Sequence, residues 1–79
     1  MKTAKVNVGD VLISLPVECL NQQTANSSVF DNVPIDSVAV DALIEANKVG
    51  VSWYHKWVIG EDRKVLYISV PTELIEWED

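Results

Sequence analysis

Two runs of alternating apolar residues, separated by Gly9-Asp10, constrain the fold of this 79-residue chain most strongly. Alternation with a period of two is typical of strands that bury one face. Glycine at the first loop position supplies the positive φ of a type II′ turn, which closes a two-residue hairpin. A shift of one residue would turn every apolar side chain to the wrong face, so the pattern predicts one register. The predicted pairs are Val8 with Val11, Val6 with Ile13, and Ala4 with Leu15.

A second pair of alternating runs, residues 51–59 and 64–70, flanks the turn-forming segment 60–63. We pair Ile59 with Lys64, which makes the two runs a second antiparallel hairpin. The core-facing positions of this hairpin are then Trp53, His55 and Trp57, opposite Val70, Ile68 and Leu66. The other face carries Tyr54, Lys56 and Val58, opposite Ser69, Tyr67 and Val65.

Residues 35–49 have the apolar spacing of an amphipathic helix, with Pro34 near its start and Gly50 after its end. Most of the apolar side chains fall on one broad face. Val40 and Ile44 lie outside that face, so the helix is apolar over more surface than contact with a single sheet requires.

Two segments have weaker patterns. Residues 20–34 are rich in Asn, Gln, Ser and Thr, and we expect a long irregular connection there, a kind that is usually functional or poorly ordered. Residues 72–79 form a tail that is either a short capped helix or an extra strand. We expect this tail to cover the flank of the helix through Leu74 and Trp77, and the alternative is cover by a second copy of the chain.

The predicted order of elements is β-β-α-β-β followed by the tail element. This order predicts an α+β fold: a four-stranded, mainly antiparallel sheet with one helix packed on one face. The length of the chain allows one domain that spans residues 1–79.

Residues that carry catalytic or metal chemistry are few. The chain has one cysteine, Cys19, and one histidine, His55, whereas metal sites need clusters of such ligands. Cys19 is interpreted as a small core residue and His55 as a side chain on the core face of its strand. Each glycine is explained by a turn or a helix end, so no phosphate-binding loop is predicted. We therefore predict no enzyme activity, no catalytic residue, no metal and no cofactor.

The charge balance narrows the choice of partner. Six Lys and Arg face twelve Asp and Glu, a formal net charge of −6 that repels phosphate backbones. Direct nucleic-acid binding is therefore not expected, whereas a basic protein surface suits this charge. No apolar run approaches the ~20 residues of a membrane helix and no signal peptide is visible, so neither a membrane nor export is expected. With one cysteine and no disulfide within the chain, we expect a cytoplasmic protein.

Two sets of residues are predicted to bind a protein partner. The first lies on the outer face of the second hairpin, where tyrosines offer apolar area with a polar tip. The second is the acidic tail, whose carboxylates in an extended chain have a spacing comparable to that of successive phosphates. Together the predicted partner-binding residues are Tyr54, Lys56, Tyr67, Glu73, Glu76, Trp77, Glu78 and Asp79.

Two resemblances bear on function. The opening residues 1–6, followed by Leu15-Pro16, resemble the start of swapped-hairpin antitoxins and transition-state regulators, which implies a dimeric DNA-binding barrel. Asp10 and Glu18 stand where such a surface needs cations. In size, charge and absence of catalytic motifs, the chain is similar to small phage-encoded inhibitors of bacterial defence, anti-CRISPR proteins among them.

The second resemblance implies the function that we predict: a small acidic inhibitor that occludes the basic nucleic-acid-binding surface of a protein complex in the host cytoplasm. The alternative is a structural or accessory interaction protein, such as a small subunit or a homodimeric virion component. An antitoxin or transcriptional regulator is the third prediction. The chain is either a monomer or a homodimer in these interpretations.

Overall fold

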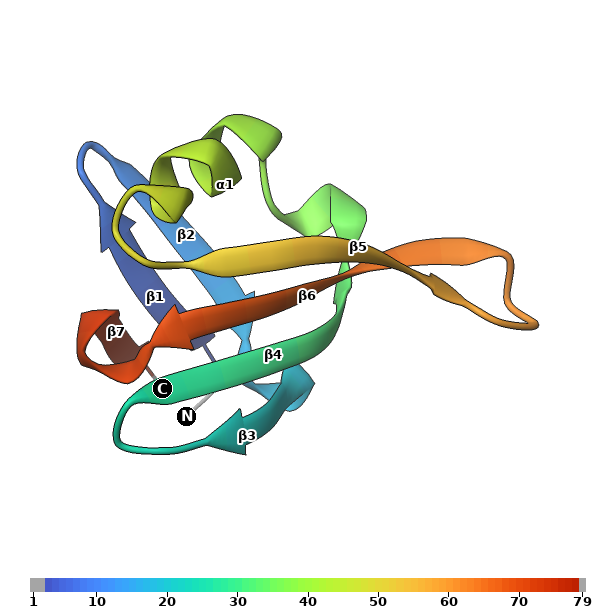
Figure 1. Ribbon diagram of the computed structural model, residues 1–79, viewed down its shortest axis with the longest axis horizontal. Helices are drawn as coiled ribbons and strands as arrows, with labels where there is room; N and C mark the ends of the chain where they lie inside the picture. The colour runs from blue at the N-terminus through green and yellow to red at the C-terminus, as the bar shows by residue number, and fades with distance from the viewer. Residues whose placement is uncertain (1–2, 79) are drawn as a thin grey trace.

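The computed structural model describes residues 3–78 and contains seven strands, one α-helix and three 3₁₀ helices (Figure 1). The strands are β1 (Thr3–Val8), β2 (Val11–Pro16), β3 (Leu20–Gln23), β4 (Ser27–Pro34), β5 (Ser52–Val58), β6 (Arg63–Pro71) and β7 (Ile75–Glu78). The helices are η1 (Val17–Cys19), η2 (Ile35–Ser37), α1 (Val40–Asn47) and η3 (Thr72–Leu74).

The strands form two antiparallel sheets, so the prediction of a single four-stranded sheet was wrong, although the α+β class is correct. The smaller sheet has the order β2-β1-β7 and the larger sheet the order β3-β4-β6-β5. The difference arises in the two segments with weak patterns. Residues 20–34 form the β3-β4 hairpin instead of an irregular connection, and the tail pairs with β1 as η3 and β7. The apolar faces of the two sheets then cover one another.

The first hairpin has the predicted register. Val8 pairs with Val11 and Val6 with Ile13, and Gly9 has a φ of 65°. All the inward side chains of β1 are buried, as is Ile13 of β2. Burial along the whole of one face leaves this pairing without a competing register.

The second hairpin is shifted by two residues from the predicted pairing. Trp57, and not Ile59, pairs with Lys64, and residues 59–62 form a four-residue turn with positive φ at Gly60 and Asp62. Because side chains alternate with a period of two, this shift keeps each residue on its predicted face. Tyr54 and Tyr67 thereby become direct neighbours.

Helix α1 is shorter than predicted, because the chain is extended at Val38 and Ala39 between η2 and α1. The predicted cover of its flank is also wrong. Leu74 and Trp77 pack against the core from η3 and β7, and Val40 and Ile44 stay 59% and 52% exposed. The tail takes its place beside β1 because its apolar residues alternate as a strand requires.

The core lies between the sheets and is closed at one end by α1 (Figure 1). Ala42, Leu43 and Ala46 are the buried residues of the helix. The indole N–H of Trp53 donates a hydrogen bond of 3.2 Å to the carbonyl of Leu43, which ties β5 to α1. The largest fully buried side chains are Phe30, Leu15, Leu43, Leu66 and Ile68.

All three prolines end a strand and cap a 3₁₀ helix. Pro16, Pro34 and Pro71 have φ between −70° and −56° and ψ between 123° and 131°, so the three corners begin with nearly the same backbone. A buried apolar residue precedes each proline, and a carboxylate is the second residue of each 3₁₀ helix. The first and third corners carry the chain from one sheet to the other.

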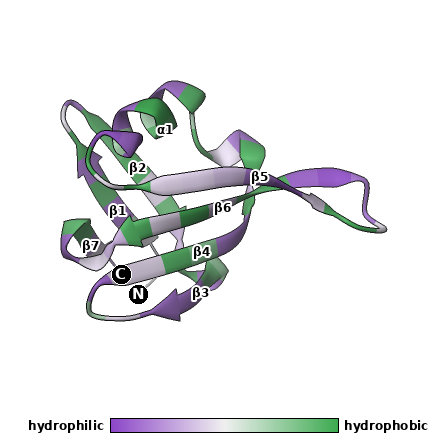
Figure 2. Cartoon of the chain, in the orientation of Figure 1, coloured by the Kyte–Doolittle hydropathy of each residue, from purple (hydrophilic) through white to green (hydrophobic). Residues whose placement is uncertain are grey.

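The hairpin of β5 and β6 extends beyond the rest of the larger sheet. The last pair between β4 and β6 is Pro34 with Val65, whereas β5 and β6 pair as far as Val58 with Arg63. Residues 57–64, here called the arm, therefore project as a two-stranded ribbon (Figure 1). The arm combines hydrophobic and hydrophilic residues without a core beneath them (Figure 2).

Candidate functional site: the outer face of the larger sheet

The outer face of the larger sheet carries the tyrosine pair predicted from the sequence. The rings of Tyr54 on β5 and Tyr67 on β6 are stacked, with centroids 4.7 Å apart and planes at 19°. Cross-strand neighbours in an antiparallel sheet have close Cβ atoms, which brings the rings into contact. Tyr54 is exposed and Tyr67 is half-buried, so the pair presents a flat aromatic surface to solvent.

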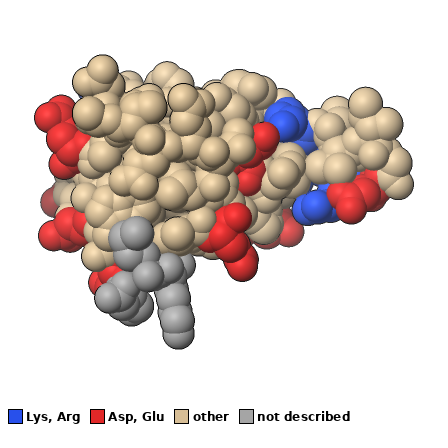
Figure 3. Space-filling model, turned by 90° about the horizontal axis from the view of Figure 1, so that it is seen from below, with Lys and Arg blue, Asp and Glu red and all other residues tan. Residues whose placement is uncertain are grey.

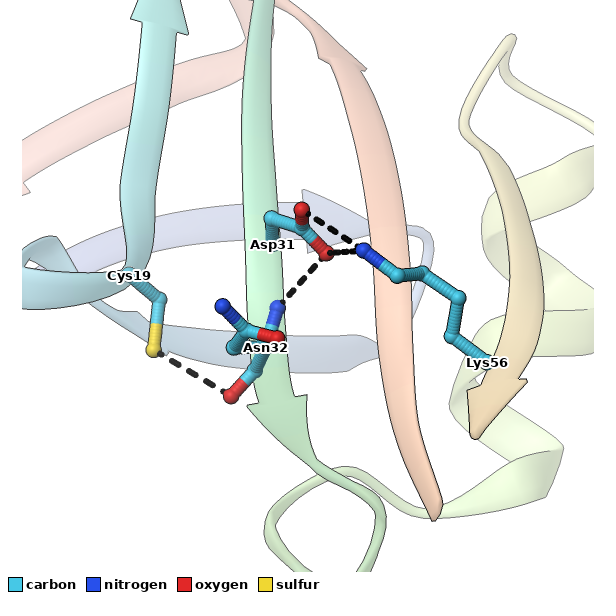
Figure 4. Close-up of polar contacts among 4 residues, drawn as sticks. All are labelled: Cys19, Asp31, Asn32 and Lys56. Atoms are coloured by element: carbon cyan, nitrogen blue, oxygen red, sulfur yellow. Dashed lines mark hydrogen bonds and ion pairs between the residues drawn. The ribbon is translucent and has the colours of Figure 1, made fainter. Parts of the chain in front are cut away.

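Beside the tyrosines, Lys56 reaches across β6 to a carboxylate on β4. Its Nζ atom lies 3.0 Å and 2.9 Å from the two oxygens of Asp31 (Figure 4). Val65, the β6 residue paired with Lys56, is fully buried although it belongs to the outer face. The ion pair thus bridges three strands, with Lys56 contributing both apolar cover and charge.

Asp31 is followed by a β-bulge. The β4-β6 register shifts between Phe30 and Val33, and Asn32 in the bulge has a φ of 58°. Asparagine tolerates this left-handed conformation better than most residues do. The backbone N–H of Asn32 donates a 2.8 Å hydrogen bond to the Asp31 carboxylate, which fixes that side chain from a second direction.

A pocket of about 200 Å³ opens beside this bulge. Six residues from η1, β3 and β4 line this bulge pocket: Glu18, Cys19, Leu20, Asn21, Asp31 and Asn32. Its carboxylate and amide oxygens accept hydrogen bonds and favour a cationic donor. The Cys19 thiol donates a long hydrogen bond of 3.8 Å to the carbonyl of Asn32 (Figure 4).

Cys19 is held in its neutral form. Burial raises the pKa of its thiol, and the nearby carboxylates of Glu18 and Asp31 raise it further. A nucleophilic cysteine needs the opposite environment, with cations or a helix N-terminus lowering the pKa. The pocket therefore suits binding rather than thiol chemistry.

The acidic tail lies on a different surface. Glu76 and Glu78 point outward from β7 on the smaller sheet, and Glu73 lies on η3. Lys5 of β1 forms an ion pair of 2.7 Å with Glu78. Trp77 points inward and packs against the core. Asp79, also predicted to bind a partner, lies outside the described residues.

The predicted partner-binding residues therefore do not form one surface. Tyr54, Lys56 and Tyr67 face outward from the larger sheet, and the tail carboxylates face outward from the smaller sheet. The core separates the two sets. The sequence did not indicate Asp31 or the bulge pocket, because both depend on the β3-β4 hairpin. The one available signal was Asp31 itself, a carboxylate directly after the buried Phe30.

The positive charges that the structure describes are all engaged. In residues 3–78, Lys5, Lys48, Lys56 and Arg63 each contact a carboxylate, and Lys64 lies 5.2 Å from the centre of the Trp57 ring. Carboxylates are distributed around the body, whereas the cations in view gather near the arm (Figure 3). No basic patch of the kind that binds phosphate results from this arrangement.

Comparisons with known proteins and two structural searches complete this description. No protein-family model, curated protein or solved structure matches the chain. Within the described range, no three His, Cys, Asp or Glu side chains gather as a metal site. The same part of the chain holds no helix with the length and apolarity needed to span a bilayer. Function is therefore argued from the geometry of the outer face.

Proposed function

We propose that this chain is a small acidic protein-binding inhibitor that occludes a basic, nucleic-acid-binding surface of a partner in the cytoplasm, as anti-CRISPR-type proteins do. The observation that carries the proposal is the continuity of the outer face. The tyrosine stack, the pair of Lys56 with Asp31 and the bulge pocket follow one another across β5, β6 and β4. Binding uses protein contacts alone and requires neither catalysis nor a cofactor.

The tyrosine stack supplies the apolar anchor of this surface. Aromatic residues are enriched at protein interfaces because they bury a large area while losing few rotatable bonds. Tyr54 and Tyr67 are already stacked in the free protein, so binding costs little additional ordering. Their hydroxyl groups remain available to donate or accept hydrogen bonds at the rim.

The bulge pocket supplies the recognition of positive charge. An arginine or lysine side chain of the partner has an apolar stem and several donors, which match Leu20 and the oxygens that line the pocket. Glu18 is exposed at its rim and Asp31 lies within it. A side chain bound here is withdrawn from the phosphate that it normally contacts, and this withdrawal is the inhibitory step.

The net charge of −6 supports the approach to such a partner. Opposite charge on a basic groove raises the association rate, and salt reduces this effect. The acidic residues of the smaller sheet contribute to this field without touching the partner. We therefore assign the tail a role in attraction and the larger sheet the role of contact.

The test is affinity capture from nuclease-treated bacterial lysate with four versions of the tagged chain: wild type, Tyr54→Ser/Tyr67→Ser, Glu18→Lys and Glu76→Lys. The last is the matched control, because it reverses one exposed carboxylate on the opposite sheet. We expect a nucleic-acid-handling protein to be captured at low salt by the wild type and by Glu76→Lys, and to be lost with the other two. The purified partner should then release labelled nucleic acid when the wild-type chain is added.

Capture of the same protein by all four versions would reject the outer face as the site. Failure of the wild-type chain to displace nucleic acid from the captured protein would reject inhibition by occlusion.

A second candidate is a structural or accessory protein that assembles with copies of itself, and the exposed Val40 and Ile44 favour it. The antitoxin or regulator class has less support, because Lys5, one of the two cations in the opening segment, is paired with Glu78.

A further inference from the structure

The arm presents more apolar surface than its place in the fold requires. Ile59, in the turn, is 97% exposed and Trp57 is 58% exposed. A two-stranded ribbon without a core beneath it is marginally stable by itself. Exposed large apolar residues that cluster on a projecting element are typical of an interaction surface.

Trp57 belongs to the opposite face of β5 from Tyr54 and Lys56, because side chains alternate along the strand. The side chain of Trp57 carries Lys64 above it, at 5.2 Å from Nζ to the ring centre. A contact made through Trp57 and Ile59 therefore differs from the outer face described above.

Helix α1 has a matching apolar flank. Val40 and Ile44 are one helical turn apart, so they lie side by side on the surface. Both are more than half exposed, and Val49 just after the helix is exposed as well. Nothing within the described chain covers this flank.

The charges of the two elements are complementary. The arm carries Glu61 and Asp62 next to Arg63 and Lys64, and therefore has no net charge. The solvated side of α1 carries Asp41 and Glu45, with Lys48 after its end. Two copies of a chain with net charge −6 repel each other over most of their surface. A neutral arm that places cations near Asp41 and Glu45 avoids that repulsion.

We propose that two copies of this chain form a dimer in which the arm of each copy lies on helix α1 of the other. Trp57 and Ile59 contact Val40 and Ile44, and Arg63 or Lys64 approaches Asp41. Two-fold symmetry makes this contact twice. Both contacts are needed, because a stable interface buries about 800 Å² on each partner.

The first experiment measures solution mass by sedimentation equilibrium over a wide concentration range. We expect the wild type, whose chain mass is 8.8 kDa, to form a concentration-dependent dimer. Ile59→Asp and Ile44→Asp should each weaken the dimer at least tenfold. Tyr54→Asp is the matched control, because it changes an equally exposed residue on the other face of β5. Far-UV circular dichroism confirms that each variant is folded.

The second experiment identifies which surfaces meet. In a Cys19→Ser background, one copy carries Ile59→Cys and the other Ile44→Cys, and the mixture is oxidised with copper phenanthroline. We expect a disulfide between positions 59 and 44 in preference to either symmetric product.

A monomer at every concentration, an undiminished dimer with Ile59→Asp, or a predominance of symmetric disulfides would each overturn the proposal. None of these outcomes affects the capture of a partner through the outer face, so the two proposals fail separately.

Discussion

The hairpins β1-β2 and β5-β6 are built from the same alternating pattern, but they relate to the core in different ways. The inward residues of β1 are buried along its whole length, and its pairing stops where the core stops. In β5, Trp53 packs against the core, whereas Trp57 lies beyond it and is more than half exposed. Alternation alone therefore does not show which part of a hairpin is buried.

The difference separates two uses of apolar residues. In β1-β2 they stabilise the fold and fix the register, because any slip would expose them. In the arm they stabilise nothing within the chain, and their exposure is consistent with contact to another molecule. The comparison yields four predictions, which begin with the largest expected effect.

The same substitution in both hairpins should have very different effects. Ile13→Ala removes buried apolar volume from β2 and should lower the free energy of unfolding by about 2–5 kcal/mol. Ile59→Ala, at an exposed position of the arm, should change it by less than about 0.5 kcal/mol. Urea unfolding of the two variants measures the contrast. Similar losses would show that the arm is part of the cooperative core.

Glycine replacement in the two turns should give a smaller contrast. Gly9 and Gly60 both have positive φ, and a Cβ atom at either would meet nothing within 4 Å. Alanine therefore introduces only backbone strain, about 1–2 kcal/mol. For Gly9→Ala the strain should appear in global stability. For Gly60→Ala we expect it mainly as faster hydrogen exchange of amides in residues 57–64, because the arm can open locally. Equal losses of global stability would contradict this division.

Removal of the ammonium group of Lys64 should have a weaker and purely local effect. Its position over the Trp57 ring contributes about 0.5–1 kcal/mol at an exposed site. Lys64→Met, which keeps an apolar side chain, should speed exchange at the amides of the arm and leave the urea midpoint nearly unchanged. A clear fall in that midpoint would link the arm to the core.

The smallest effect concerns pH and the corner that follows β2. The pKa of Cys19 is raised in the folded state, so folding favours the protonated thiol. Its contribution to stability is present below the pKa of the unfolded thiol, about 8.5, and is lost as pH rises toward the folded value. We expect wild-type stability to fall slightly more than that of Cys19→Ser between pH 8 and 10. Parallel curves would show that the thiol is not desolvated.

The sequence predicted those features in which burial and pattern agree. The register of β1-β2 follows from an apolar face that is buried throughout. The apolar character of Ile59 extended the second pattern beyond the core, which explains the shift of two residues in β5-β6. The strand β3 was missed because its residues are polar and lie at the edge of a sheet. The bulge at Asn32 also interrupts alternation in β4.

The candidate site shows the same limit. Tyr54 and Tyr67 were placed on one face because that placement needs only the period of a strand. The contact of Lys56 with Asp31 joins residues from β5 and β4 across an intervening strand. No local pattern encodes such a contact, since it depends on the order of strands in the sheet.

The three proline corners also provide a means of recognising other chains with this architecture. They share one hexapeptide: an apolar residue, proline, a β-branched residue, a carboxylate, any residue and an apolar residue. The positions of Pro16, Pro34 and Pro71 set the spacing between its three copies. A search with this spaced motif scores positions that the backbone geometry restricts, and it ignores the solvent-facing positions where sequences diverge fastest. Homologues too divergent for whole-chain alignment would still share these three short words.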